Sequence, residues 1–156
     1  MGYTHYWGVK RSRKTAKKDQ IQFEKACIAI SKALHTYQKT VSDDARLSGY
    51  SAHTKPGSYG GIRFNGKGDL SHEDFSLPEY FKENEGGFCK TANKPYDTAV
   101  VAALILLKHY MGDAVGVSSD GDAAEWLEGL RLAKTVCPSA KIPDTIRGVP
   151  LKALRA

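Results

Sequence analysis

Cysteine is scarce in this sequence of 156 residues, and the spacing of its three cysteines is informative. Cys27, Cys89 and Cys137 lie far apart, and none belongs to a Cys-x-x-Cys pair. A zinc ribbon is therefore excluded, and an odd number of cysteines without a disulfide framework favours a reducing compartment. The length fits a single domain over residues 1–156, which can bury a hydrophobic core without cross-links.

Long hydrophobic runs are also absent. The longest apolar stretch, Ala99 to Leu107, is far shorter than the ~20 residues that cross a bilayer. The opening residues MGYTHYWGVKRSRK lack the apolar segment of a signal peptide. Tyr6 also stands where a myristoylation motif has Ser or Thr. We therefore expect a cytoplasmic protein with no membrane partner.

Specific catalytic motifs are missing as well: the sequence has no Walker loop, no HExxH and no GxSxG. Two weaker groups remain, Cys89 with a distant histidine and the run His72-Glu73-Asp74. Nothing near Cys89 in the sequence activates it, and the run also reads as the exposed face of an edge strand. We predict no catalytic residue, no metal site and no cofactor, and we favour a binding protein over an enzyme.

Positive charge, in contrast, is abundant. The formal net charge is +6, which favours an anionic partner such as a nucleotide or a nucleic acid. Six basic residues fall between Lys10 and Lys18. This run is either a solvated loop or a patch that steers polyanions toward the protein.

Hydrophobic periodicity predicts an α+β or α/β protein. One apolar stripe with steps of three and four residues predicts a helix over residues 19–41, with Asp19 capping its start: Phe23, Cys27, Ile30, Leu34, Tyr37 and Val41. The remaining elements are strand 2–9, loop 42–61, hairpin 62–77, irregular segment 79–94, helix 95–112, strand 114–118, a helix from 122 and a basic, proline-containing tail 138–156. We expect one mixed sheet of about four short strands packed with three helices, in the order β-α-β-β-α-β-α.

Polar residues crowd the predicted entrance of the helix at 95–112. They are Lys90, Thr91, Asn93, Lys94, Tyr96 and Asp97. A helix N-terminus offers unpaired N–H groups and a partial positive charge, so these residues predict an anion site. Capping of the helix by Thr91 or Asn93 is the structural alternative, but it does not account for the lysines.

Two further groups are candidates for ligand contacts. Ser119 and Asp120 follow a predicted strand, where α/β proteins place ligand groups, although Asp120 could equally hold the turn. On the first strand, an aromatic side chain such as Tyr6 or Trp7 could stack on a base. Arg63 and Asn65 on the predicted hairpin could face the same ligand.

Several segments together resemble an uncharacterised family of small bacterial and bacteriophage proteins. The resemblance runs from the first strand to the third helix, omits the tail and implies no catalytic residue. It rests on GYTHYW at the start, IRFNG at 62–66, FCKTANKPYD at 88–97 and SSDG at 118–121. By type alone, such a chain is also similar to phage anti-defence proteins that sequester cyclic oligonucleotides or ADP-ribose derivatives without cleaving them.

The leading hypothesis is therefore a protein that binds and sequesters a small phosphorylated nucleotide, in the bacterial host cytoplasm if the chain is phage-encoded. The alternatives are a small phosphodiesterase or nucleotide hydrolase, and a nucleic-acid-binding module that uses Lys10–Lys18 and the tail. Proteins of the sequestering kind are often homo-oligomers, for which Tyr80 and Phe81 are the candidate contact.

Overall fold

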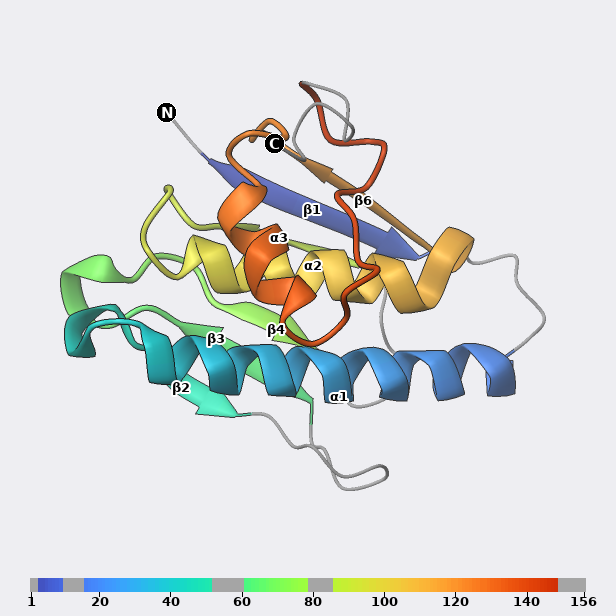
Figure 1. The fold of residues 1–156 in the computed structure, drawn as a ribbon, viewed down its shortest axis with the longest axis horizontal. Coiled ribbons are helices and arrows are strands. Elements are labelled where there is room, and N and C mark those ends of the chain that lie inside the picture. Colours follow the sequence, from blue (N-terminus) through green and yellow to red (C-terminus); the bar gives the residue numbers. More distant parts are fainter. Residues whose placement is uncertain (1–2, 10–15, 52–60, 79–85, 149–156) are drawn as a thin grey trace.

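The computed structural model describes residues 3–9, 16–51, 61–78 and 86–148, and it has the α+β fold predicted from the sequence (Figure 1). The helices are α1 (Ala16–Thr40), α2 (Asp97–Met111) and α3 (Leu127–Lys134). The strands are β1 (Thr4–Val9), β2 (Ser48–Ser51), β3 (Ile62–Asn65), β4 (Phe75–Leu77), β5 (Gly87–Lys90) and β6 (Val115–Ser119).

The strands of the described residues form two three-stranded sheets instead of the single mixed sheet that we expected. Their orders are β5-β1-β6 and β2-β3-β4, and every pairing is antiparallel. In the first sheet β1 is the central strand, although both of its neighbours come much later in the chain.

Two strands account for the error, because β2 and β5 lie in segments predicted to be loop or irregular. Each has only four residues, SGYS and GFCK, which is too short for an alternating pattern to be recognised. The pairing of β2 with β3 also shifts register between Ser48 and Ser51. These strands are specified by their partners across the sheet more than by their own composition.

Helix α2 is the centre of the hydrophobic core. It is apolar on nearly every side, and Ala99 to Leu107 are all buried. The helix packs against α1, α3 and β6, and in Figure 1 it crosses the middle of the molecule with α3 in front of it. Within the described ranges, no helix is both long enough and apolar enough to cross a membrane.

The predicted apolar stripe of α1 is confirmed. Phe23, Cys27, Ile30 and Leu34 are fully buried, and Tyr37 is nearly so. The helix begins earlier than expected, so that Asp19 lies in its first turn instead of capping it.

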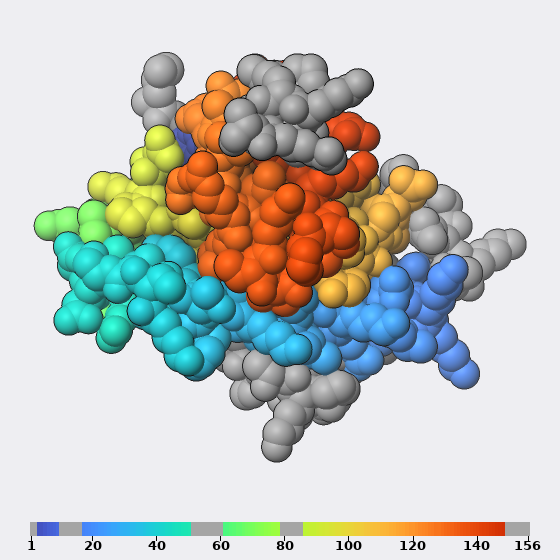
Figure 2. Space-filling model, in the orientation of Figure 1, coloured from blue at the N-terminus to red at the C-terminus, as the bar shows by residue number. Residues whose placement is uncertain are grey.

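The segment after α3 is packed against the rest of the protein up to residue 148. Ala140, Ile142 and Ile146 are buried, and the backbone N–H of Ala123 donates to the carbonyl of Arg147. Figure 2 shows this segment and α3, in orange to red, lying above the blue α1 on the viewed face. Residues 149–156 of the predicted tail lie outside the described residues.

Candidate functional site

The sheet β5-β1-β6 has two chemically different faces, because side chains along β1 alternate in direction. His5 and Trp7 are buried against the core, whereas Tyr6 and Gly8 are exposed on the opposite side. The register of the sheet brings seven residues together on that opposite side. We call this the outer face, and it consists of Thr4, Tyr6, Gly8, Phe88, Lys90, Gly116 and Ser118.

Cross-strand pairing arranges the outer face in three rows. They run from Lys90 to Thr4, from Phe88 through Tyr6 to Ser118, and from Gly8 to Gly116. The first row is basic and polar. The second contains the two aromatic rings, and the third, made of glycines, has no side chains.

The aromatic row exposes two large rings. Phe88 is 63% exposed and Tyr6 is 43% exposed, whereas most other large apolar side chains of the described residues are buried. An exposed apolar side chain is not unusual by itself, but two such side chains paired across neighbouring strands form an apolar patch. A patch of this kind is a place where another molecule can be bound.

The glycine row leaves the sheet surface open. A Cβ atom placed on Gly8 or Gly116 would meet no atom within 4 Å, and neither glycine has a positive φ. Their backbone conformation therefore does not require glycine, and glycine weakens a strand interior. A paired row of unnecessary glycines is typical of a surface that another group approaches closely.

Lys90 contributes positive charge to this face. Its backbone is held firmly, since its N–H donates to Glu73 Oε1 at 2.8 Å and its carbonyl accepts from the N–H of Glu73 at 3.1 Å. Among the described residues, its ammonium group makes no hydrogen bond or ion pair. The charge is therefore available to an anion.

The opposite, inner face of the same strands carries a buried chain of hydrogen bonds. His5 Nε2 lies 2.5 Å from Asp97 Oδ1, and His5 Nδ1 lies 2.7 Å from Ser119 Oγ. Thr91 Oγ1 donates to the same Asp97 oxygen at 2.7 Å. His5 and Thr91 are fully buried and Asp97 is 7% exposed. The chain links β1, β6 and the entrance of α2.

Counting donors and acceptors fixes the direction of these bonds. Ser119 Oγ accepts from the N–H of Gly121 at 2.9 Å and from Trp126 Nε1 at 3.2 Å, which occupies both of its lone pairs. Its hydroxyl proton must then be donated to His5 Nδ1, so the ring proton is on Nε2 and is donated to Asp97.

Ser119, His5 and Asp97 are the residue types of a hydrolase triad. Their hydrogen bonds, however, indicate a structural role and not a catalytic one. A nucleophilic serine needs a free lone pair and access to substrate, and both lone pairs of Ser119 are engaged. His5 has no exposed surface. We conclude that this series of hydrogen bonds fixes the position of the sheet against α2.

The predicted anion site at the helix entrance is divided between the two sides of the sheet. Thr91 and Asp97 belong to the buried chain, and Tyr96 is 1% exposed, with its hydroxyl donating to the Glu73 carbonyl at 2.6 Å. Asn93 is exposed and Lys94 is half-buried. Because the ring of Tyr96 is in the core, it is not available to a ligand at the helix entrance.

Trp7 is also in the core. Its ring lies 5.1 Å from that of Phe75 and is 7% exposed, so it cannot stack on a ligand. Residues at neighbouring strand positions face opposite ways, and therefore only Tyr6 of the two candidates on β1 is available.

Arg63 and Asn65 lie in the other sheet and bond within their own hairpin. Arg63 donates from Nε and Nη2 to Asp74 Oδ2 at 3.0 and 2.8 Å. Asn65 donates to Asp74 Oδ1 and to the carbonyl of His72, and it accepts from two backbone N–H groups. Both side chains of the predicted pair therefore stabilise the hairpin in this structure.

Asp120 lies at the edge of the outer face. Its Oδ2 accepts from the N–H of Thr4 at 3.0 Å, and its own N–H donates to the carbonyl of Thr4. The side chain is exposed, and Arg147 donates to its backbone carbonyl. Asp120 thus extends the row that contains Lys90 and Thr4.

The residues considered for catalysis, Cys89 and the run His72-Glu73-Asp74, do not form a common site. Cys89 is fully buried, and burial raises the pKa of its thiol to about 12, which opposes formation of a thiolate. His72 Nδ1 contacts the carbonyl of Lys90, while hydrogen bonds from Arg63 and Asn65 lower the pKa of Asp74. Within the described residues, no three His, Cys, Asp or Glu side chains are grouped as metal ligands.

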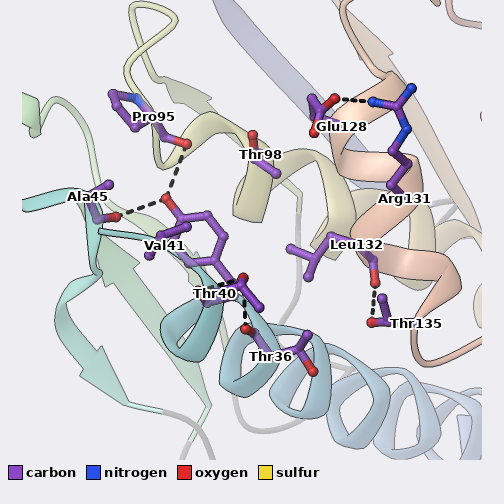
Figure 3. Close-up of a pocket in the computed structure, with 11 residues that line it drawn as sticks. Thr36, Thr40, Val41, Ala45, Pro95, Thr98, Glu128, Arg131, Leu132 and Thr135 are labelled. Carbon is purple, nitrogen blue, oxygen red and sulfur yellow. Dashed lines mark hydrogen bonds and ion pairs between the residues drawn. The ribbon is translucent and has the colours of Figure 1, made fainter. Parts of the chain in front are cut away.

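A groove of about 440 Å³ lies where α1 ends, α2 begins and α3 passes (Figure 3). Most of its hydroxyl groups are already bonded to the backbone: Thr36 to Lys32, Tyr37 to Ala45 and Pro95, Thr40 to Thr36 and Tyr37, and Thr135 to Leu132. Arg131 at its rim pairs with Glu128. The groove therefore presents mostly methyl groups and engaged donors, and we assign it no ligand.

Phe88, Gly8, Gly116 and Ser118 were missed in the sequence. Residues two apart in a strand face the same side, so residues 6 and 8 share one side, as do residues 88 and 90. This relation can be used only once residues 87–90 are known to be a strand. Residues 10–15 of the basic run and the predicted contact Tyr80–Phe81 lie outside the described residues.

Comparison with known proteins finds no match to a protein family, to a curated protein or to a solved structure.

Proposed function

We propose that the outer face binds a small phosphorylated nucleotide and holds it without cleaving it. The observation that carries the proposal is the exposed pair Tyr6 and Phe88, with Lys90 two residues along β5 on the same side of the sheet. Every nucleobase has a π-face that stacks on an aromatic ring, and an ammonium group neutralises phosphate.

The surroundings of the rings support a flat ligand. The glycine row leaves open space beside Tyr6, so the plane of a base is not obstructed by side chains. Ser118, opposite Tyr6, is exposed and adds a hydroxyl group that can bond a base edge. Asp120 at the end of the basic row has a second carboxylate oxygen for a ribose hydroxyl. Asn93 and Lys94 lie in the turn between β5 and α2.

Binding without cleavage is favoured over hydrolysis by the state of the serine. The one Ser–His–Asp series of the described residues is saturated by its own hydrogen bonds and faces the core. If the chain is phage-encoded, retention of an intact nucleotide would remove an immune signal such as a cyclic nucleotide or an ADP-ribose derivative from the host cytoplasm.

The test is titration calorimetry of the full chain with adenine nucleotides, using wild type, Tyr6→Ala and Lys90→Ala. Loss of one stacking ring costs about 1–3 kcal/mol, so Tyr6→Ala should weaken binding about 5- to 150-fold. Lys134→Ala, which removes the same charge from an exposed site on α3, is the matched control and should leave binding unchanged.

Bound nucleotide is then recovered by heating the complex and is analysed by mass spectrometry. Intact ligand is expected, and a cleaved product would replace the proposal with a nucleotide hydrolase. Equal loss in Lys90→Ala and Lys134→Ala would mean that only net charge matters. Binding that requires long nucleic acid and weakens steeply with salt would instead support the nucleic-acid module.

A further inference from the structure

The outer face offers two stacking surfaces, and this determines what kind of nucleotide it fits. Tyr6 and Phe88 are direct cross-strand partners, so their Cβ atoms are about 4.5–5.5 Å apart. Neither ring makes a ring-to-ring contact with another aromatic side chain in the described part of the chain. Each ring therefore keeps its own face available.

From this arrangement we infer that the ligand carries two bases joined through phosphate, with one base stacked on Tyr6 and the other on Phe88. The inference rests on the proposed function and names the ligand class of the same site. A mononucleotide or an ADP-ribose derivative has one base and leaves one ring exposed to water. A dinucleotide covers both.

The position of Lys90 matches the linking phosphate. Along β5 it lies two residues from Phe88, which is about 7 Å in a strand. From Tyr6 it is the diagonal neighbour across the strand pair, at about 7–8 Å. An ammonium group on a flexible four-carbon chain can therefore reach a phosphate that connects bases over the two rings.

The glycine row explains how a ligand wider than one base fits. Tyr6 is followed by Gly8 on β1, and Gly116 is the cross-strand partner of Gly8. With no side chain at either position, the base on Tyr6 can extend along the sheet and its edge can reach the exposed Ser118.

The charges around the face favour a small dinucleotide over a segment of a long single strand. A continuous strand needs a groove of positive charge along its backbone. Here the row that contains Lys90 ends at the exposed carboxylate of Asp120, which repels a further phosphate. The occupant is therefore a short molecule, linear or cyclic, with two bases.

The experiment compares four probes by titration calorimetry with the full chain: AMP, ADP-ribose, linear 5′-phosphorylated di-adenylate and cyclic di-AMP. A fifth probe, a dodecamer of deoxyadenylate, tests for a long strand. The second stacked base should make at least one dinucleotide bind about 5- to 150-fold more tightly than AMP. Tyr6→Ala or Phe88→Ala should each reduce that dinucleotide to about the affinity of AMP.

Gly116→Val tests the open row, because valine suits a strand and its position is unobstructed. It should weaken the dinucleotide and leave the unfolding midpoint within a few degrees of wild type. Ser76→Val, at an exposed position of β4 in the other sheet, is the matched control and should bind normally. If Phe88→Ala fails to fold, Phe88→Leu removes the aromatic face and keeps most of the bulk.

The outcomes separate this inference from the proposed function. Equal affinity for AMP and both dinucleotides, with binding still lost in Tyr6→Ala, overturns the two-base ligand and leaves nucleotide binding intact. Absence of binding to any probe overturns both. Tightest binding to the dodecamer, with several proteins on each strand, overturns the commitment to a small ligand.

Discussion

Tyr6 and Trp7 are neighbours in the sequence, yet they belong to different parts of the molecule. Trp7 is packed in the core against Phe75, and Tyr6 is exposed on the outer face beside Phe88. The same division runs through the whole sheet. The inner face carries the buried hydrogen bonds that hold the fold. The outer face carries open glycines and, among the residues that the structure describes, two rings without aromatic partners and an ammonium group without a hydrogen bond. The odd-numbered residues His5 and Trp7 of this strand thus serve stability, and the even-numbered Tyr6 and Gly8 remain exposed for the binding that we propose.

The sharpest test of this division is the pair Trp7→Ala and Tyr6→Ala. Trp7→Ala removes a large buried ring and should lower the free energy of unfolding by about 3–5 kcal/mol. Tyr6→Ala removes a ring from a residue that is 43% exposed and should lower it by less than about 1 kcal/mol. Urea denaturation followed by circular dichroism measures both. Similar losses would mean that the two faces are not separate.

The buried chain of hydrogen bonds should show the next largest effect. Asp97→Ala leaves His5 Nε2–H and the Thr91 hydroxyl without an acceptor, at a cost of about 1–3 kcal/mol for each buried group. We expect a total loss of about 2–4 kcal/mol in the free energy of unfolding, below the simple sum because both groups share one acceptor atom. Asp113→Ala, an exposed aspartate just after α2, should change it by less than about 0.5 kcal/mol. The assigned network is refuted if the two variants unfold at the same urea concentration.

Two glycines sharpen the comparison further. A Cβ on Gly129 would lie 2.3 Å from Val101 Cγ1, where α3 crosses α2, whereas a Cβ on Gly116 meets nothing. Gly129→Ala gains helix propensity but overpacks the core, for a net loss of about 1–2 kcal/mol. Gly116→Ala should be neutral or add up to about 1 kcal/mol. Thermal unfolding of both variants measures the difference, and a stabilised Gly129→Ala would contradict the close helix contact.

The smallest expected effect is a pH dependence from the inner face. Burial raises the pKa of Cys89 from 9.0 to about 12. The thiol of the unfolded chain therefore loses its proton before that of the folded chain, and the free energy of unfolding falls as pH rises from 9 toward 12. At pH 10 this thiol accounts for about 1 kcal/mol of that fall. In Cys89→Ala, the free energy of unfolding should fall less between pH 9 and 11 than in wild type. An equal fall in the two proteins would show that the pKa of the Cys89 thiol is not the cause.

The helices and the first strand could be predicted from the sequence because their patterns are local. The stripe of α1 repeats over about five turns. Helix α2 is an uninterrupted apolar segment, and both helices were therefore found with nearly correct ends. The strand β5 could not be found in this way. Its four residues become a strand only by pairing with β1, and that pairing joins residues eighty or more positions apart.

The candidate site was predicted only in part for the same reason. Tyr6 and Lys90, both named from the sequence, lie on the outer face. In contrast, Thr91, Tyr96 and Asp97, which were assigned to a ligand, lie in the core. Composition identifies polar and aromatic residues, whereas the face on which each lies depends on register. His5 and Ser119 meet across 114 residues of sequence, and no local pattern indicates such a contact.

The central position of β1 has a consequence for how the chain reaches its native state. The hydrogen bonds made by Thr4 and His5 close loops of 92, 114 and 116 residues. Such long loops must be ordered before any of these bonds contributes, and proteins dominated by distant contacts fold slowly. During synthesis β1 leaves the ribosome well before both of its neighbours, with Tyr6 and Trp7 equally exposed. Only when β6 docks does the strand acquire one side that must stay dry and one that can remain in water.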